Sequence, residues 1–329
     1  MLFDAATLER LTTENPTEAW RTIIQKALEV AQERLDGVEL VKEILSRDRE
    51  IGKLDTFLST AGWDLWRDFS TVVERNSNRL VRWWSEPYAA KAVLILDGLS
   101  LRELPWITHG AKDRGFSVHE VSAYASELPG ETNQFAQALG FSSRSQLQNN
   151  SAGASHHLHP AFTESGDLPW EDCTKLIDNS PNTVFWHHWP DSKIHDGSGA
   201  GQGLETLTQD VMNKLTSDAF WGFIERLATG RRLVITSDHG FAATGHFADA
   251  DGDVAQYLKS TFASGRSAAG SSARSPYVPP VALEVHGPHG QYVMALGRRK
   301  WKSQGGYPTL THGGLSVLEV LSPFVEISK

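Results

Sequence analysis

The stretch AVLILDG, residues 92–98, decides the fold class of this 329-residue chain. Its apolar residues run without interruption and end in Asp97 and a glycine. A short continuous apolar run that ends in a turn signal is typical of a strand buried on both faces, as in a parallel sheet. Residues 116–124, 183–189 and 233–238 read as further strands, and helical stretches such as 204–228 lie between them. We therefore expect an α/β fold, with a mostly parallel central sheet and helices on both of its faces.

The chain before this strand predicts helices up to about residue 86. Residues 18–35, EAWRTIIQKALEVAQERL, place apolar side chains at three- and four-residue spacing. We therefore divide the chain into an N-terminal helical region, residues 1–88, and an α/β domain, residues 89–329. The helical region holds tryptophans that could stack on bases, but their helical spacing favours a core or interdomain role: Trp63, Trp66, Trp83 and Trp84.

Composition narrows the classes of function. The formal net charge is −9, which argues against a protein that coats duplex DNA by neutralising phosphates. It leaves room for a small phosphorylated substrate, because bound metal ions supply positive charge locally. The single cysteine, Cys173, excludes an intrachain disulfide and thiolate zinc sites. Neither a signal peptide nor an apolar run of about 20 residues is evident, so we expect a cytoplasmic protein without membrane contact.

Possible metal ligands follow three of the predicted strands. In open α/β sheets, ligands bind beyond the carboxyl ends of the strands. A strand-terminal aspartate alone is weak evidence, because such residues also cap helices and turns. Here the chain order supplies three carboxylates and three imidazoles, a set that suits two zinc ions and also accepts manganese. The candidate ligands are Asp97, Asp191, His195, Asp238, His239 and His312.

The order of these motifs resembles the alkaline phosphatase superfamily. An Asp-Gly after a strand, a threonine some 35 residues later, Asp-x-x-x-His, Asp-His-Gly and a late Thr-His-Gly-Gly occur in the superfamily's sequence order. More narrowly, residues 90–329 are similar to a PglZ-type domain, and the N-terminal helices lie outside the resemblance. The resemblance implies one zinc on Asp191, His195 and His312, and the other on Asp97, Asp238 and His239. It also implies that the oxygen of Thr132, in the segment LPGETNQFA, lies between the two ions as the nucleophile.

The chemistry of Thr132 agrees with that role. A threonine hydroxyl is a poor nucleophile until a base or a metal lowers its pKa, and a metal pair clamps both ends of an in-line displacement. The helix predicted to follow would add backbone N–H groups that favour a phosphate. Alternatively, Thr132 is only a helix N-cap. Ser100 and, more weakly, Ser126 are the other candidate nucleophiles, although Ser100 with Glu103 suits a capping box.

Several other polar residues have a structural and a functional interpretation. Arg102 and Asn133 are candidates either for supporting the metal ligands or for contacting a phosphate. Residues 262–276 read as a Gly/Ser-rich mobile loop, on which Arg266 and Arg274 are solvated or meet an anionic substrate.

The remaining histidines also have a structural and a functional interpretation. We expect the HHLHP cluster at residues 156–160 to lie on the surface and His187 and His188 to be core or supporting residues. His246 is the best spare ligand.

These observations favour a two-metal phosphoester hydrolase that forms a phosphothreonine intermediate. The resemblance implies a phosphodiesterase acting on nucleotides or nucleic-acid ends, in a bacterial setting such as phage defence of the BREX type or signalling, with possible protein partners in a defence complex. The alternative is a non-catalytic zinc-binding scaffold whose N-terminal helices bind a partner. All candidate positions are filled, which favours the enzyme. A sulfatase motif is absent around Cys173, and the interval from Thr132 to Asp191 is too short for the inserted domain of a phosphomutase.

Overall fold

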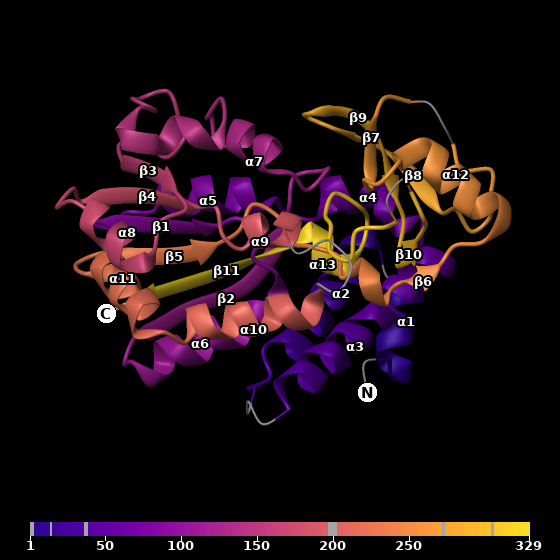
Figure 1. Cartoon of the computed structure of the whole chain (residues 1–329), viewed down its shortest axis with the longest axis horizontal. Helices are drawn as coiled ribbons and strands as arrows, with labels where there is room; N and C mark the ends of the chain where they lie inside the picture. Colours follow the sequence, from indigo (N-terminus) through magenta and orange to yellow (C-terminus); the bar gives the residue numbers. More distant parts are fainter. Residues whose placement is uncertain (1–2, 14, 36–38, 197–202, 272–273, 304–305) are drawn as a thin grey trace.

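A six-stranded sheet forms the centre of the computed structural model, with helices on both of its faces (Figure 1). The structure describes residues 3–13, 15–35, 39–196, 203–271, 274–303 and 306–329. The strand order is β2-β11-β5-β1-β4-β3. β1 pairs in parallel with β4 and β5, β3 pairs in parallel with β4, and β11 alone runs antiparallel to its neighbours β5 and β2. The predicted mostly parallel α/β fold is confirmed. The strands are β1 Lys91–Leu96, β2 Ser117–Ala125, β3 Phe162–Gly166, β4 Asn182–His187, β5 Arg232–Thr236 and β11 Leu321–Ser328.

Strand β1 is apolar throughout because both of its faces are covered. Alternate side chains point to opposite faces of a sheet. Leu94 and Leu96 accordingly belong to a hydrophobic cluster that includes residues of α6 and α11, whereas Val93 and Ile95 belong to a second cluster with residues of α5 and α7. Leu94 lies opposite Phe185 of β4 and is fully buried. The run AVLIL is thus the seam between two layers of the core.

Further helices follow or lie between the strands. They are α6 Leu104–Asp113, α7 Thr132–Ala138, α8 Trp170–Leu176, α9 Asp191–Asp196, α10 Leu204–Leu215, α11 Asp218–Ala228, α12 Gly252–Phe262 and α13 Val317–Val320. Helix α12 packs in a separate cluster with the second sheet described below. Short 3-10 helices are η1 Leu101–Glu103, η2 Arg144–Asn150 and η3 Thr244–His246.

The N-terminal residues form helices as expected. These are α1 Ala5–Thr13, α2 Pro16–Ala31, α3 Leu40–Thr60, α4 Leu65–Val72 and α5 Asn76–Trp84. Asn15 caps α2 by accepting a hydrogen bond from the Glu18 backbone N–H at 3.1 Å. Trp66, Trp83 and Trp84 are buried, which supports their interpretation as core residues. The division of the chain at residue 88 stays a prediction.

A second, three-stranded sheet lies between the late ligands in the sequence. It has the order β7-β9-β8, with β7 Ser267–Ala269, β8 Ala282–Gly287 and β9 Gly290–Ala295, and the short strands β6 Ala248–Asp249 and β10 Arg299–Lys300 pair separately. The expectation of a solvated loop over residues 262–276 is wrong for Arg266. This side chain is buried, and its guanidinium binds Glu319, because the neighbouring β7 pairs with β9 and turns Arg266 inward.

No helix of the described residues is long and apolar enough to cross a membrane.

Replacement of Leu94 by alanine tests the central position of β1. The side chain is fully buried, so its loss should lower the free energy of unfolding by about 2–5 kcal/mol, as large-to-small core substitutions do. Urea denaturation of the cation-free protein measures the effect. Leu168→Ala, at a side chain that is 45% exposed, is the matched control and should change stability little. A small loss in Leu94→Ala would contradict the described packing.

Candidate metal centre

The strand order places the predicted ligands at one edge of the sheet. β5, β1 and β4 are adjacent and parallel, so their carboxyl ends lie side by side. Asp97 follows β1, Asp191 begins α9 just after β4, and Asp238 follows β5. Backbone hydrogen bonds join two of these turns, since the N–H of Asp191 donates to the Asp97 carbonyl at 2.8 Å. Sheet topology therefore converts three distant sequence positions into one acidic site.

Two groups of side chains have the geometry of a cation site. Ligand atoms of Asp191, His195 and His312 lie within 4.8 Å of one another, and so do ligand atoms of Asp97, Asp191 and His239. The first group matches the set implied for one zinc. The second group contains Asp191 where the resemblance implies Asp238. Asp191 therefore lies within reach of both positions.

Asp238 nevertheless lies in the same centre. Its Oδ1 accepts a hydrogen bond from the Gly98 N–H at 3.0 Å, which ties the end of β5 to the turn after β1. Its Oδ2 is 3.5 Å from Nε2 of His239. Gly98 has a φ of +73°, and a Cβ there would lie 3.2 Å from the Cβ of Asp191. A glycine is needed here both for the left-handed backbone and for the close approach of the two turns.

Backbone carbonyls orient two of the imidazoles. Nδ1 of His312 is 2.9 Å from the Gly130 carbonyl oxygen, and Nδ1 of His239 is 3.0 Å from the Gly240 carbonyl oxygen. A carbonyl only accepts, so each Nδ1 carries the proton and each Nε2 keeps its lone pair. This is the arrangement found around histidines that ligate metals, in which the second nitrogen is held by an acceptor.

Three buried polar atoms of the centre lack hydrogen-bond partners among the described residues: Oδ1 of Asp191, Oδ2 of Asp238 and Nε2 of His239. Buried polar atoms without partners are rare in folded proteins because each costs free energy. All three are lone-pair donors of the kinds that zinc binds, and bound cations would satisfy them. The residues present therefore fit a two-metal centre.

Crowding of the carboxylates perturbs their protonation. Burial, together with the charges of Asp238 and Asp191, raises the pKa of Asp97 well above its usual value. Burial alone would also raise the pKa of Asp191, but the hydrogen bond from His195 and the neighbouring imidazoles lower it to about 2. Burial and the nearby His239 lower the pKa of His312 to about 4, so this imidazole is neutral at neutral pH, as a ligand must be.

Thr132 lies against the first aspartate. Its Oγ1 donates to Asp97, with distances of 3.3 and 3.4 Å to the two carboxylate oxygens. It is the first residue of α7, and the N-cap is Glu131, so the interpretation of Thr132 as a cap is wrong. The predicted capping box of Ser100 and Glu103 is confirmed. Ser126 is buried against Ser322 and does not contact the centre.

Sequence reasoning missed Arg144. This residue begins η2, and its guanidinium forms an ion pair with Oδ2 of Asp97. The side chain is 27% exposed while Asp97 is fully buried, so Arg144 reaches the centre from the solvent side. No motif marks it in the sequence, because it stands in a polar stretch, SSRSQ, that resembles any surface turn.

Two other polar candidates differ in exposure. Asn133 is exposed, and its role stays a prediction. Arg102 is buried and bonded to Asp48, so its interpretation as a phosphate contact is wrong, and its interpretation as a supporting residue stays a prediction. His187 is a satisfied core histidine, bonded to the Leu168 carbonyl at 3.0 Å.

Two further histidine predictions can be judged from their surroundings. His156 is buried and stacks on Phe141 with ring centroids 4.7 Å apart, so the expectation of a surface histidine is wrong for this residue. His246 pairs with Glu205 and belongs to neither candidate cation group.

Comparisons with known proteins give fold neighbours only. No protein-family model matches the sequence, and no curated protein matches it. Among solved structures, the chain is similar to murine ectonucleotide pyrophosphatase/phosphodiesterase 5, with 13% identity over 72% of this chain and 87% of that chain and a TM-score of 0.46. An inactive variant of that murine protein in complex with AMP gives a TM-score of 0.47, and the human protein gives 0.42 at 12% identity. Nothing about the chemistry of this chain follows from a likeness at these TM-scores.

Replacement of Asp97 by asparagine tests the carboxylate repulsion. The folded protein raises the pKa of Asp97, so its ionisation costs stability increasingly as pH rises above the unfolded value of about 3.8. In the cation-free protein, Asp97→Asn should therefore raise the melting temperature at pH 7, and the gain should shrink as pH falls and vanish only well below pH 3.8, where the carboxyl is protonated in both the folded and the unfolded state. Asp172→Asn, at an exposed carboxylate, is the control and should show no such trend. A loss of stability in cation-free Asp97→Asn at pH 7 would contradict the described crowding.

Proposed function

We propose that this chain is a two-metal phosphoester hydrolase with Thr132 as its nucleophile, acting as a phosphodiesterase on nucleotides or nucleic-acid ends. The observation that carries the proposal is a hydroxyl hydrogen-bonded to Asp97 within a centre of three carboxylates and three imidazoles. Neutral and ionised ligands of this kind suit zinc, with manganese as the other candidate. The PglZ-type resemblance adds a bacterial defence setting with protein partners to the proposal.

The ligand assignment within this proposal follows the motif order. Asp191, His195 and His312 would hold one ion, and Asp97, Asp238 and His239 the other. When bound, the ions supply Lewis-acid charge that lowers the pKa of a hydroxyl and polarises phosphoryl oxygens. Four of the six ligands are buried, so little water competes for these positions: Asp97, Asp191, Asp238 and His239.

The chain's own groups account for the transfer of the phosphoryl group. The hydroxyl proton of Thr132 points to the Asp97 carboxylate, which is placed to receive it. Oγ1 then forms a bond to phosphorus, and the bond from phosphorus to the leaving alcohol oxygen breaks with its electron pair on that oxygen. The leaving oxygen takes a proton from solvent. In the second half, a water oxygen bonds to phosphorus and releases a proton to solvent, the Oγ1–phosphorus bond breaks with its electron pair on Oγ1, and Asp97 returns the proton to Oγ1.

Arg144 extends the proposal to substrate binding. Its planar guanidinium offers paired N–H donors that match phosphoryl oxygens. In this structure, the guanidinium binds the same carboxylate that accepts the Thr132 hydroxyl. We infer that Arg144 contacts the non-bridging oxygens of the phosphoryl group during transfer.

The direct test uses the purified full chain. Metal analysis should find about two divalent ions per chain. Aryl phosphodiesters, aryl monoesters, nucleotides and single-stranded oligonucleotides should then be screened for hydrolysis. Bound metal without turnover of any ester would favour the alternative of a zinc-binding scaffold, and a protein that binds no divalent ion would overturn the proposal.

Thr132→Ala tests the nucleophile. Removal of the hydroxyl should lower kcat by at least about a thousandfold, because among the described residues only this hydroxyl donates to Asp97, while metal content stays near the wild-type value. Thr132→Ser is the matched control and should keep measurable turnover and form a phosphoserine. Full activity in the alanine variant would show that Thr132 is not the nucleophile.

Arg144→Ala tests the phosphoryl contact. Loss of one well-placed donor should lower kcat/KM by about 10²–10³-fold, with most of the effect on kcat if the contact strengthens in the transition state. Arg144→Lys should recover part of the loss because it keeps the charge. Arg21→Ala, at an exposed arginine of α2, serves as the control. Wild-type kcat/KM in Arg144→Ala for every ester would remove this residue from the mechanism.

A further inference from the structure

Helix α3 presents two buried carboxylates to the segment that carries His312. Asp48, Gly52 and Asp55 are spaced by four and three residues, which places them on one face of the helix. Both carboxylates are essentially unexposed, with relative side-chain exposures of 1% and 0%. A helix does not bury two carboxylates against the rest of a protein without cationic or N–H partners.

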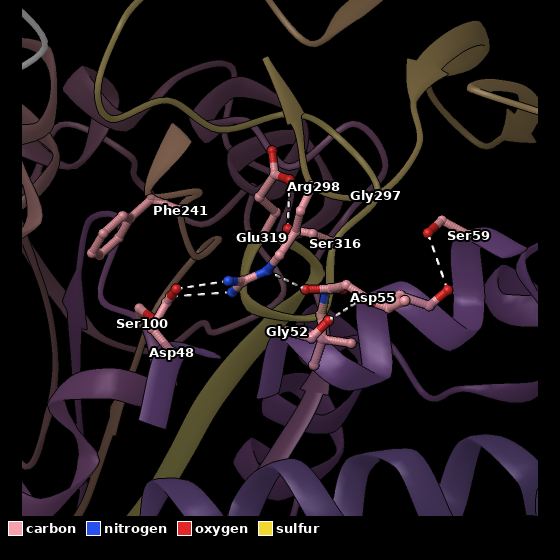
Figure 2. Close-up of polar contacts among 12 residues, drawn as sticks. Asp48, Gly52, Asp55, Ser59, Ser100, Phe241, Gly297, Arg298, Ser316 and Glu319 are labelled. Atoms are coloured by element: carbon pink, nitrogen blue, oxygen red, sulfur yellow. Dashed lines mark hydrogen bonds and ion pairs between the residues drawn. The ribbon is translucent and has the colours of Figure 1, made fainter. Parts of the chain in front are cut away.

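Arg298 joins the two carboxylates. Its Nε donates to Asp55 at 2.8 Å and its Nη1 donates to Asp48 at 2.7 Å (Figure 2). Gly52 leaves the room for this guanidinium, because a Cβ there would lie 2.8 Å from Nη1. A glycine inside a helix costs about 1 kcal/mol relative to alanine. The helix propensity of α3 is therefore lower at Gly52, where the Arg298 guanidinium packs against the helix.

Asp55 also holds the turn after His312 directly. Its second oxygen accepts a hydrogen bond from the backbone N–H of Val317, the first residue of α13, at 2.7 Å. The residue before Arg298 contributes as well, since the N–H of Gly297 donates to the Leu315 carbonyl at 2.8 Å. The Asp55 carboxylate thus attaches the C-terminal end of the loop that carries His312 to helix α3.

Glu319 links two turns that carry candidate ligands, the turn of His239 and the turn of His312, which we call the ligand turns. Its Oε1 accepts from the Gly314 N–H and from Nε of Arg266, each at 2.8 Å. Its backbone carbonyl accepts from the Gly240 N–H at 3.1 Å, next to the ligand His239. A Cβ at Gly240 would lie 2.2 Å from the Leu318 carbonyl oxygen, so the two turns are in close contact.

Asp48 supports the other side of the centre. It accepts from Nε of Arg102 at 3.0 Å, and Nη1 of Arg102 donates to the Phe241 carbonyl at 2.9 Å, two residues after His239. Burial alone would raise the pKa of Asp48, but Arg102 and Arg298 lower it to about 2, so this carboxylate is ionised throughout the physiological range. Loss of one partner would leave a buried charge without compensation, which is strongly destabilising for the local geometry.

We infer that α3 supports the metal centre, and that Asp55 is a positioning residue. It holds His312 close enough to Asp191 and His195 for the three side chains to bind one cation. Asp55 acts through Arg298 and the backbone of Val317, and contacts no cation itself. The inference rests on the proposed metal function. This face of α3 packs against Arg298 of the same chain and is therefore not accessible to a partner protein.

Asp55→Asn tests this role, with Glu120→Gln as the matched control. Asparagine keeps an acceptor for Val317 but loses the charge that holds Arg298. Glu120 forms a comparable half-buried pair with Arg79, at 2.5 Å, on β2 and away from the ligand turns. Zinc affinity of each full-length protein should be measured by competition with a chromogenic chelator. Asp55→Asn should weaken the binding of at least one ion by about 10–100-fold, as loss of an orienting partner does, and Glu120→Gln should leave both affinities unchanged. Wild-type affinity in Asp55→Asn would overturn the inference.

A second measurement separates this inference from the proposed function. In cation-free protein, hydrogen exchange at the amides of Gly314 and Val317 should speed up in Asp55→Asn and not in Glu120→Gln. Unchanged exchange at these amides would overturn the attachment to α3, whether or not the protein binds zinc. Absence of zinc binding in the wild type would instead overturn the proposed function. If Asp55→Asn does not fold, Arg298→Lys weakens the same attachment while keeping the charge, and the same outcomes apply.

Discussion

The burial of three neighbouring carboxylates constrains the rest of this structure. Asp97, Asp191 and Asp238 stand at the ends of three adjacent parallel strands, and all three are buried. Burial, and then the charges of Asp238 and Asp191, raise the pKa of Asp97, so keeping this carboxyl ionised costs free energy. Without compensating partners, three buried carboxylates at this position lower the stability of the fold. The surrounding histidines and the unpartnered lone pairs are those expected of the proposed cation site, and the Arg144 guanidinium offsets part of its negative charge.

Buried ion pairs, in which acidic and basic side chains balance in charge, hold the turns that carry the candidate ligands. Asp48, Asp55, Arg102 and Arg298 form one such network, of which Figure 2 shows Asp48, Asp55 and Arg298, and Arg266 with Glu319 forms another. Buried ion pairs contribute little net stability, because desolvation offsets their attraction. They do impose direction, since each guanidinium has fixed donor geometry. In this protein, they attach the ligand turns to α3 and to each other.

Sequence pattern was sufficient for the strands that obey local rules, and it named candidate ligands whose role stays a prediction. The runs at 92–97, 183–189 and 233–238 are apolar because both faces of their strands are buried, and such runs are visible without a structure. The candidate ligands followed from their positions at the ends of these strands. Arg144 was missed because a polar 3-10 turn carries no periodic signal, and Arg266 was misread because its segment has the Gly/Ser composition of a loop. The antiparallel strand β11 was also missed, since its pairing partners β2 and β5 are set by topology alone.

By itself, the sequence determined which side chains can ligate and which segments form the buried strands, because both depend on residue type and short-range periodicity. Only the tertiary structure decided which of those side chains meet. The order β5-β1-β4 brings Asp238, Asp97 and Asp191 together, and it places Asp191 within reach of both candidate cation positions. It also decided that α3 underlies the loop of His312, through contacts between residues more than two hundred positions apart. Such long-range pairings depend on the summed packing of the whole domain, which no local pattern of residues encodes.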